Sequence, residues 1–220
     1  MGKTIEERLS EGRQYRDIPL SRIELREADD GERIVEGYAS TFMQPYELWR
    51  MDNYIVKEQI APEAFDKTDF SDVIMQYNHE GRVFARTSNG TLVLSTDDHG
   101  LHTRANLAGT ELGRQVYDEI RGGYTTKMSF GFRVAKDKRE DIEDAETGQI
   151  TILRTILEVA KLYDVSPVSM PANDATAISA RALGEGLIAE VAEEIRRRED
   201  ERRQRERQRQ RIRILMEVNK

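Results

Sequence analysis

Two residue types in this chain could together perform nucleophilic catalysis: histidine and serine. The sequence has three histidines and no cysteine, so a thiolate nucleophile is excluded. Histidine is the usual general base near neutral pH because its pKa lies close to 7. His79 follows an apolar stretch, whereas His99 and His102 lie in or beside a turn. By residue type alone, most histidines are structural or merely exposed, and spacing alone does not pair His79 with Ser129.

Ser129 stands in a segment whose apolar residues alternate with small ones. Met128, Phe130 and Phe132 recur with a period of two, which is typical of a half-buried strand. Ser129 and Gly131 then share the opposite face, and the missing side chain of Gly131 would let a substrate backbone approach. An ordinary exposed strand serine remains the simpler interpretation of the spacing. Because Ser129 is not in a G-x-S-x-G motif, an α/β-hydrolase is disfavoured.

Support for a metal or a cofactor is weak. His99 and His102 stand near Asp97 and Asp98, but this cluster is short and typical of a turn. The chain has neither a phosphate-binding P-loop nor a dinucleotide-binding glycine motif. We therefore expect no metal and no cofactor.

Short apolar runs separated by turn residues predict a mainly β protein, of α+β type. One amphipathic helix is expected over residues 109–121, with Thr110 as its N-cap and Gly122 at its end. Residues 136–149 are charged and are expected to form an exposed hairpin loop. The predicted strands are residues 22–25, 33–41, 52–60, 72–78, 84–86, 91–95, 100–106, 127–134 and 150–168.

Charge divides the chain into parts. Residues 186–220 hold 11 basic and 8 acidic residues, whereas the rest holds 23 basic and 33 acidic residues. We expect a flexible arm over residues 1–18, one domain over 19–184 and a charged helical tail over 185–220.

No apolar run approaches the roughly 20 residues of a membrane helix. The charged N-terminus has neither a signal-peptide core nor a myristoylation pattern.

Three ordered stretches resemble the HK97-type prohead protease family of tailed phages. They are Tyr77-Asn78-His79, Met128-Ser129-Phe130-Gly131-Phe132, and Asp164-Val165-Ser166-Pro167-Val168 with Pro171-Ala172-Asn173; Val35-Glu36-Gly37-Tyr38-Ala39 precedes them. The resemblance covers roughly residues 20–182. It implies the fold of the herpesvirus assemblins, a closed, mostly antiparallel β-barrel surrounded by helices.

The resemblance also implies roles for individual residues. His79 matches the family's catalytic histidine and Ser129 its nucleophile. Asp164 is expected as the third member, with Glu158 as an alternative on the same strand. Backbone N–H groups of Ala172 and Asn173 are candidates for stabilising the oxyanion.

The function implied is a serine endopeptidase that cleaves scaffold or capsid protein, and itself, during prohead maturation. It would act in the host cytoplasm inside the assembling prohead, without a membrane, and could form a homodimer by analogy with assemblins. The alternative is a catalytically inactive capsid-assembly or scaffolding factor acting through the tail. Ten arginines between Arg196 and Arg213 could contact phosphates. Because acidic residues are interspersed and aromatic ones are absent, a nucleic-acid partner is disfavoured.

Overall fold

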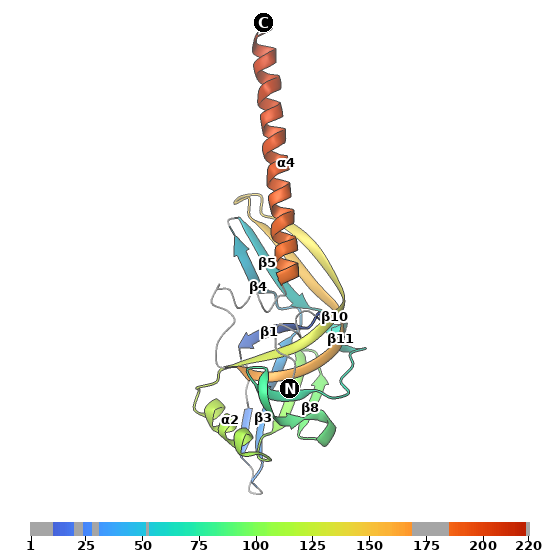
Figure 1. Cartoon of the computed structure of the whole chain (residues 1–220), viewed down its shortest axis with the longest axis vertical. Helices are drawn as coiled ribbons and strands as arrows, with labels where there is room; N and C mark the ends of the chain where they lie inside the picture. The colour runs from blue at the N-terminus through green and yellow to red at the C-terminus, as the bar shows by residue number, and fades with distance from the viewer. Residues whose placement is uncertain (1–10, 20–23, 28–30, 52, 169–184, 219–220) are drawn as a thin grey trace.

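The computed structural model describes residues 11–19, 24–27, 31–51, 53–168 and 185–218. Most elements are strands, arranged in two sheets below a long projecting helix (Figure 1). The mainly β architecture with few helices agrees with the sequence-based prediction. Among the described residues, no helix is both long and apolar enough to span a bilayer.

The larger sheet is built on two long strands that pair along their length. Its main path is β1–β10–β11–β5–β4, and β6 joins it by pairing with β11 and with β7. Most pairings are antiparallel, but β11 runs parallel to β5 and to β6. The strands are β1 (Gln14–Pro19), β4 (Tyr46–Met51), β5 (Tyr54–Ile60), β6 (Ile74–Tyr77), β7 (Glu80–Arg86), β10 (Lys127–Glu143) and β11 (Ile150–Val168).

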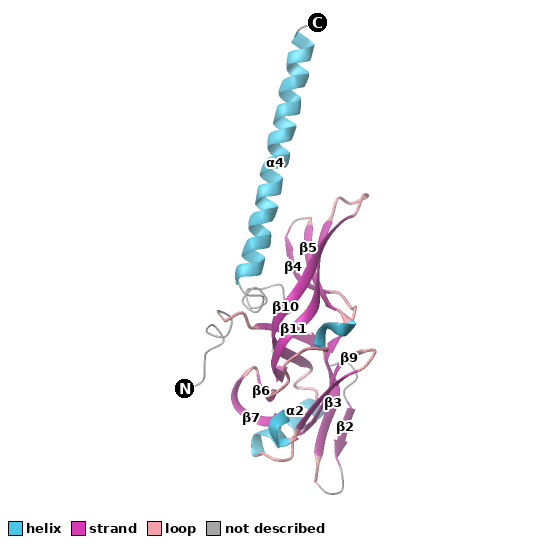
Figure 2. Ribbon diagram, turned by 90° about the vertical axis from the view of Figure 1, so that its right-hand side faces the viewer, coloured by secondary structure: helices cyan, strands magenta, loops and turns pink. Residues whose placement is uncertain are grey.

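The smaller sheet packs against the lower part of the larger one (Figure 2). Its order is β2 (Glu24–Glu27), β3 (Arg33–Thr41), β9 (Gly100–Asn106) and β8 (Leu92–Thr96). One apolar core is shared by both sheets and by α2 (Glu111–Arg121). Thr110 caps α2 by accepting a hydrogen bond from the Gly113 N–H at 2.9 Å, as predicted. Short 3₁₀ turns occur at Pro62–Phe65 and Thr87–Asn89.

The predicted closed barrel was wrong. Both sheets are open: the smaller one ends at β2 and β8, and the larger one ends at β1, β4 and β7. In the described residues, a single isolated bridge from Phe42 to Ile60 joins the sheets instead of a continuous ladder. The physical reason is that β11 changes partner along its length, from β5 to β6, so the sheet branches rather than curling onto itself.

Two further expectations about extended segments need correction. The arm over residues 1–18 is not loose throughout, because residues 14–19 form β1 and pair with β10; residues 1–10 lie outside the described part. Residues 136–149 are not one hairpin loop, since β10 continues to Glu143 and pairs with β11 up to Ile150. Both segments are rich in charge, and their strand form comes from pairing with a neighbour rather than from apolar alternation.

The tail forms α4 (Glu185–Val218), which projects far beyond the sheets (Figure 1). Ile195 is buried against Tyr54, Val56 and Ile152 at the upper end of the larger sheet. Arg198 forms ion pairs with Asp141 of β10 and Glu194 of its own helix. These contacts fasten the lower part of α4 to the sheet.

A buried ion network fastens β1 to the larger sheet. Glu58, fully buried, accepts hydrogen bonds from Arg16 (2.9 Å at Oε2), Arg154 (2.8 Å) and Tyr46 (2.6 Å). Burial alone would raise the pKa of Glu58, but the guanidinium groups of Arg16 and Arg154 lower it below its ordinary value. The carboxylate is therefore ionised at neutral pH and joins four strands, β1, β4 and β11 to its own strand β5.

Glu58→Gln is expected to destabilise the fold by about 3 kcal/mol at pH 7, because it removes the carboxylate that two buried arginines share. A carboxyl whose folded pKa is depressed contributes stability above its unfolded pKa and loses it as pH falls towards the folded value. The difference between wild type and Glu58→Gln should therefore shrink below about pH 4.3. Urea unfolding at several pH values measures it.

The matched control is Glu47→Gln, since Glu47 forms an exposed pair with Arg50. It should change stability by less than about 1 kcal/mol. Equal losses in both variants would contradict the role given to the buried network.

Candidate active site

His79 is presented by a tight turn. It lies with Asn78 between β6 and β7, where Tyr77 pairs with Glu80. Both turn residues have positive φ, 49° for Asn78 and 62° for His79, as a type I′ hairpin turn requires. The Asn78 N–H donates to the carbonyl of Pro167 at 3.1 Å. This bond ties the turn to β11, the strand that carries Asp164.

Ser129 and Asp164 lie on the neighbouring strands β10 and β11. Ser129 pairs with Ser166, and Gly131 pairs with Asp164. Residues two apart on a strand point to the same face, so these four residues share one face of the sheet. The apolar neighbours Met128 and Phe130 point the other way, into the shared core.

The three side chains form one hydrogen-bonded chain. His79 Nε2 lies 2.7 Å from Ser129 Oγ, and His79 Nδ1 lies 2.5 Å from Asp164 Oδ1. In the tautomer with the proton on Nδ1, His79 donates to Asp164 and accepts from the serine hydroxyl. This is the arrangement in which a histidine can remove the proton of a serine and a carboxylate can stabilise the resulting imidazolium.

The site is buried. Ser129 and Asp164 have no exposed surface, and His79 is 8% exposed. Asp164 Oδ1 also accepts a hydrogen bond from Ser166 Oγ at 2.9 Å. Ser166 therefore helps to hold the carboxylate, a role that sequence reasoning missed although the residue stands two positions from Asp164. Because Ser129 is covered, a substrate of any kind reaches Oγ only when neighbouring groups move.

Gly131 has a different role from the one expected. It is buried, and a Cβ atom there would lie 2.4 Å from Asp164 Oδ2 and 2.8 Å from Cε1 of Tyr15. The missing side chain therefore makes room for the carboxylate and the tyrosine ring, not for a substrate backbone. Gly131 allows Asp164 to lie beside His79.

Gly131→Ala is expected to displace Asp164 and lower the reactivity of Ser129 by on the order of 100-fold, because small misplacements of reacting groups are costly. Overpacking should also destabilise the fold by about 1–3 kcal/mol. Gly109→Ala is the control, since a Cβ there meets nothing within 4 Å. Rates at a temperature where both variants are folded separate the two effects, and unchanged activity of Gly131→Ala would contradict this account.

The remaining predicted residues do not join this chain of hydrogen bonds. Glu158 lies six residues before Asp164 on β11, which is about 20 Å along an extended strand, and its partly exposed carboxylate pairs with Lys67 at 3.7 Å. Ala172 and Asn173 lie outside the described residues.

The other two histidines lie in the smaller sheet and its turn. His99 and His102 pack edge-on against Tyr38, and Asp97 accepts a hydrogen bond from the Tyr38 hydroxyl. In the described part of the chain, no three potential ligands cluster to hold a metal.

Comparison with known proteins identifies a family. Residues 21–187 match the family described as caudovirus prohead serine protease. Among solved structures, the bacteriophage T4 capsid assembly protease matches with a TM-score of 0.39 and 11% sequence identity, over 71% of this chain and 98% of that one. No curated protein matches.

Proposed function

Because this chain belongs to the caudovirus prohead serine protease family, we propose that it is a serine endopeptidase that processes scaffold or capsid protein, and itself, during prohead maturation. Ser129 is the nucleophile, His79 the general base and Asp164 the carboxylate that orients His79. The observation that carries this proposal is the continuous hydrogen-bonded chain from Asp164 through His79 to Ser129.

The proposed reaction is acyl transfer in two halves. Ser129 Oγ attacks the scissile carbonyl while its proton passes to His79 Nε2, and the imidazolium then protonates the leaving amine. Water hydrolyses the acyl-enzyme by the same steps, with His79 taking a proton from the water and returning it to Ser129 Oγ. Asp164 holds His79 Nδ1 throughout and stabilises the imidazolium. Backbone N–H groups of Ala172 and Asn173 remain our proposal for the oxyanion donors.

Co-expression with candidate capsid and scaffold substrates tests the proposal. Fragments followed by mass spectrometry should appear with wild type and vanish with Ser129→Ala. Fragments that persist with Ser129→Ala would show that another nucleophile acts, and the fragment ends from wild type would give the cleavage specificity.

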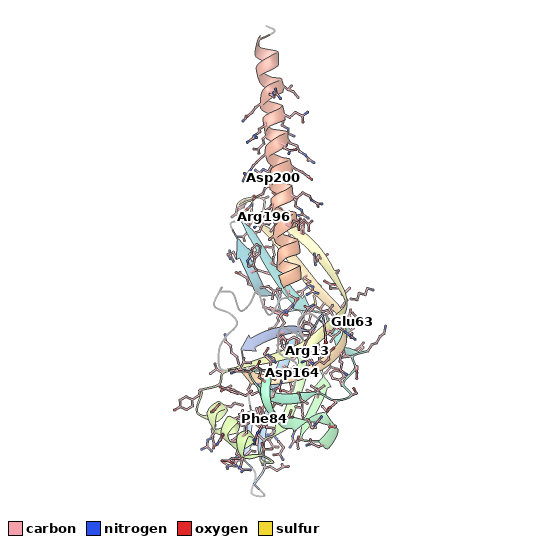
Figure 3. All side chains as sticks on the ribbon, viewed as in Figure 1. Arg13, Glu63, Phe84, Asp164, Arg196 and Asp200 are labelled. Atoms are coloured by element: carbon pink, nitrogen blue, oxygen red, sulfur yellow. The ribbon has the colours of Figure 1, made fainter. Side chains whose placement is uncertain are left out.

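A second candidate is a non-enzymatic assembly factor that acts through α4. Residues 199–212 of this helix are nearly all exposed. Two ion pairs each join residues one helical turn apart, Arg203 with Glu199 and Arg202 with Glu206. Figure 3 shows charged side chains along the projecting part, including Arg196 and Asp200. Such a helix suits a tether to a partner in the prohead. Prohead assembly that survives Ser129→Ala but fails without residues 199–220 would favour this second function.

A further inference from the structure

The first strand contributes a side chain to the surroundings of His79. Tyr15 of β1 stands opposite Gly131 of β10 in the antiparallel register. Its ring centroid lies 4.3 Å from that of the His79 imidazole, at an interplanar angle of 56°. Tyr15 is 4% exposed, so its ring is a fixed wall of the site. The imidazole is thus held at its two nitrogens by Ser129 and Asp164 and on its ring by Tyr15.

Arg13 links the same tyrosine to the carboxylate. Its Nη1 donates to the Tyr15 hydroxyl at 3.3 Å and lies 3.6 Å from Asp164 Oδ2. The guanidinium stacks over the Tyr163 ring, 3.7 Å from its centroid, which fixes its position. Figure 3 shows Arg13 and Asp164 near one another in the middle of the molecule. Within the described residues, Asp164 Oδ2 has no hydrogen-bond partner, so Arg13 supplies its counter-charge.

The opposite face of β1 fixes the strand in place. Arg16, the neighbour of Tyr15, bonds to the buried Glu58, and Arg154 donates to Gln14 at 3.0 Å. Side chains alternate along a strand, so Gln14 and Arg16 anchor one face of β1 while Tyr15 contacts His79 on the other face. A shift of β1 would therefore move both sets of contacts together. β1 is therefore held in register by one face while its other face contacts the His79–Asp164 pair.

We propose that Tyr15 and Arg13 are positioning residues that hold His79 and Asp164 in the geometry needed for proton transfer. This inference rests on the proposed function. Tyr15 prevents the imidazole from rotating away from Ser129, and Arg13 keeps the carboxylate turned towards Nδ1. Both residues act through His79 and Asp164, so the effect falls on the rate of the chemical step and not on substrate binding.

The test uses the full chain, incubated with capsid or scaffold protein so that the covered Ser129 becomes accessible, and a fluorophosphonate probe that reacts with activated serines. Tyr15→Phe keeps the ring and should react at nearly the wild-type rate. Tyr15→Leu keeps an apolar side chain but removes the ring, and it should lower the maximal rate of labelling at Ser129 on the order of 10–100-fold, with the probe's half-saturating concentration unchanged. Proton NMR should show that the downfield signal of the hydrogen-bonded Nδ1 proton of His79 persists in Tyr15→Phe and is lost in Tyr15→Leu.

Arg13→Gln covers the case in which Tyr15→Leu does not fold, because Arg13 is partly exposed and lies immediately before β1. It should slow labelling and weaken the Nδ1 signal, whereas Arg26→Gln, which removes a surface ion pair in the smaller sheet, should change neither. Folded Tyr15→Leu or Arg13→Gln with wild-type labelling would overturn this inference and leave the proposed function intact. Absence of labelling at Ser129 in wild type would instead contradict the proposed function itself.

Discussion

Ser129→Ala and His79→Ala are each expected to reduce proteolysis by on the order of 10⁶-fold, and the double variant should be no slower than either single one. Non-additivity follows because the two side chains act in one step: without the base the hydroxyl is a weak nucleophile, and without the hydroxyl the base has no proton to take. Their 2.7 Å contact is the structural basis of this coupling. The measurement is the rate of fragment formation from a purified capsid or scaffold substrate.

His102→Ala is the matched control for the histidine. His102 lies on β9 in the smaller sheet and packs against Tyr38, away from the Ser129 chain. It should leave the rate nearly unchanged. A double variant much slower than both single variants would mean that Ser129 and His79 act independently, which would contradict the shared step.

Asp164→Asn should lower the maximal rate by about 10⁴-fold with little change in substrate affinity. The introduced amide would offer an N–H or a neutral oxygen in place of the carboxylate and so favour the wrong imidazole tautomer. The effect should be large because Asp164 is fully buried and its Oδ1 contacts both His79 and Ser166. Steady-state kinetics with one peptide from the mapped cleavage site would separate the two constants.

Glu158→Gln is the informative control, because both carboxylates stand on β11 and sequence reasoning left both open. Glu158 pairs with Lys67 at the surface, so its replacement should leave the maximal rate close to wild type. If Glu158→Gln were inactive and Asp164→Asn active, the assignment of the third member would be reversed.

The sequence predicted the local features of the site better than their assembly. Alternation around Ser129 placed it correctly on the face away from Met128 and Phe130, and the Asn78-His79 turn lies where the apolar run of β6 ends. The proximity of Ser129, His79 and Asp164 depends on long-range strand pairing. Spacing alone could not give it, and only the family resemblance suggested it.

The features that were missed or misinterpreted have a common physical cause: each depends on contacts between residues that are far apart in the sequence. Gly131 could be taken as open to a substrate because nothing local indicates that Asp164 and Tyr15 fill its space. Residues 14–19 look like a polar arm, because their strand form depends on pairing with β10 and on the buried partner Glu58. Barrel closure failed as a prediction for the same reason: the change of partner along β11 leaves no signal in its own sequence.

The most direct measurement of the central claim is mass-spectrometric mapping of the fluorophosphonate adduct in a sample that is actively cleaving capsid or scaffold protein, so that access to the site is assured. We predict a single adduct on Ser129 Oγ in wild type and almost none in His79→Ala. An adduct on a different serine, or equal labelling of Ser129 in His79→Ala, would contradict the assignment of Ser129 as a nucleophile activated by His79.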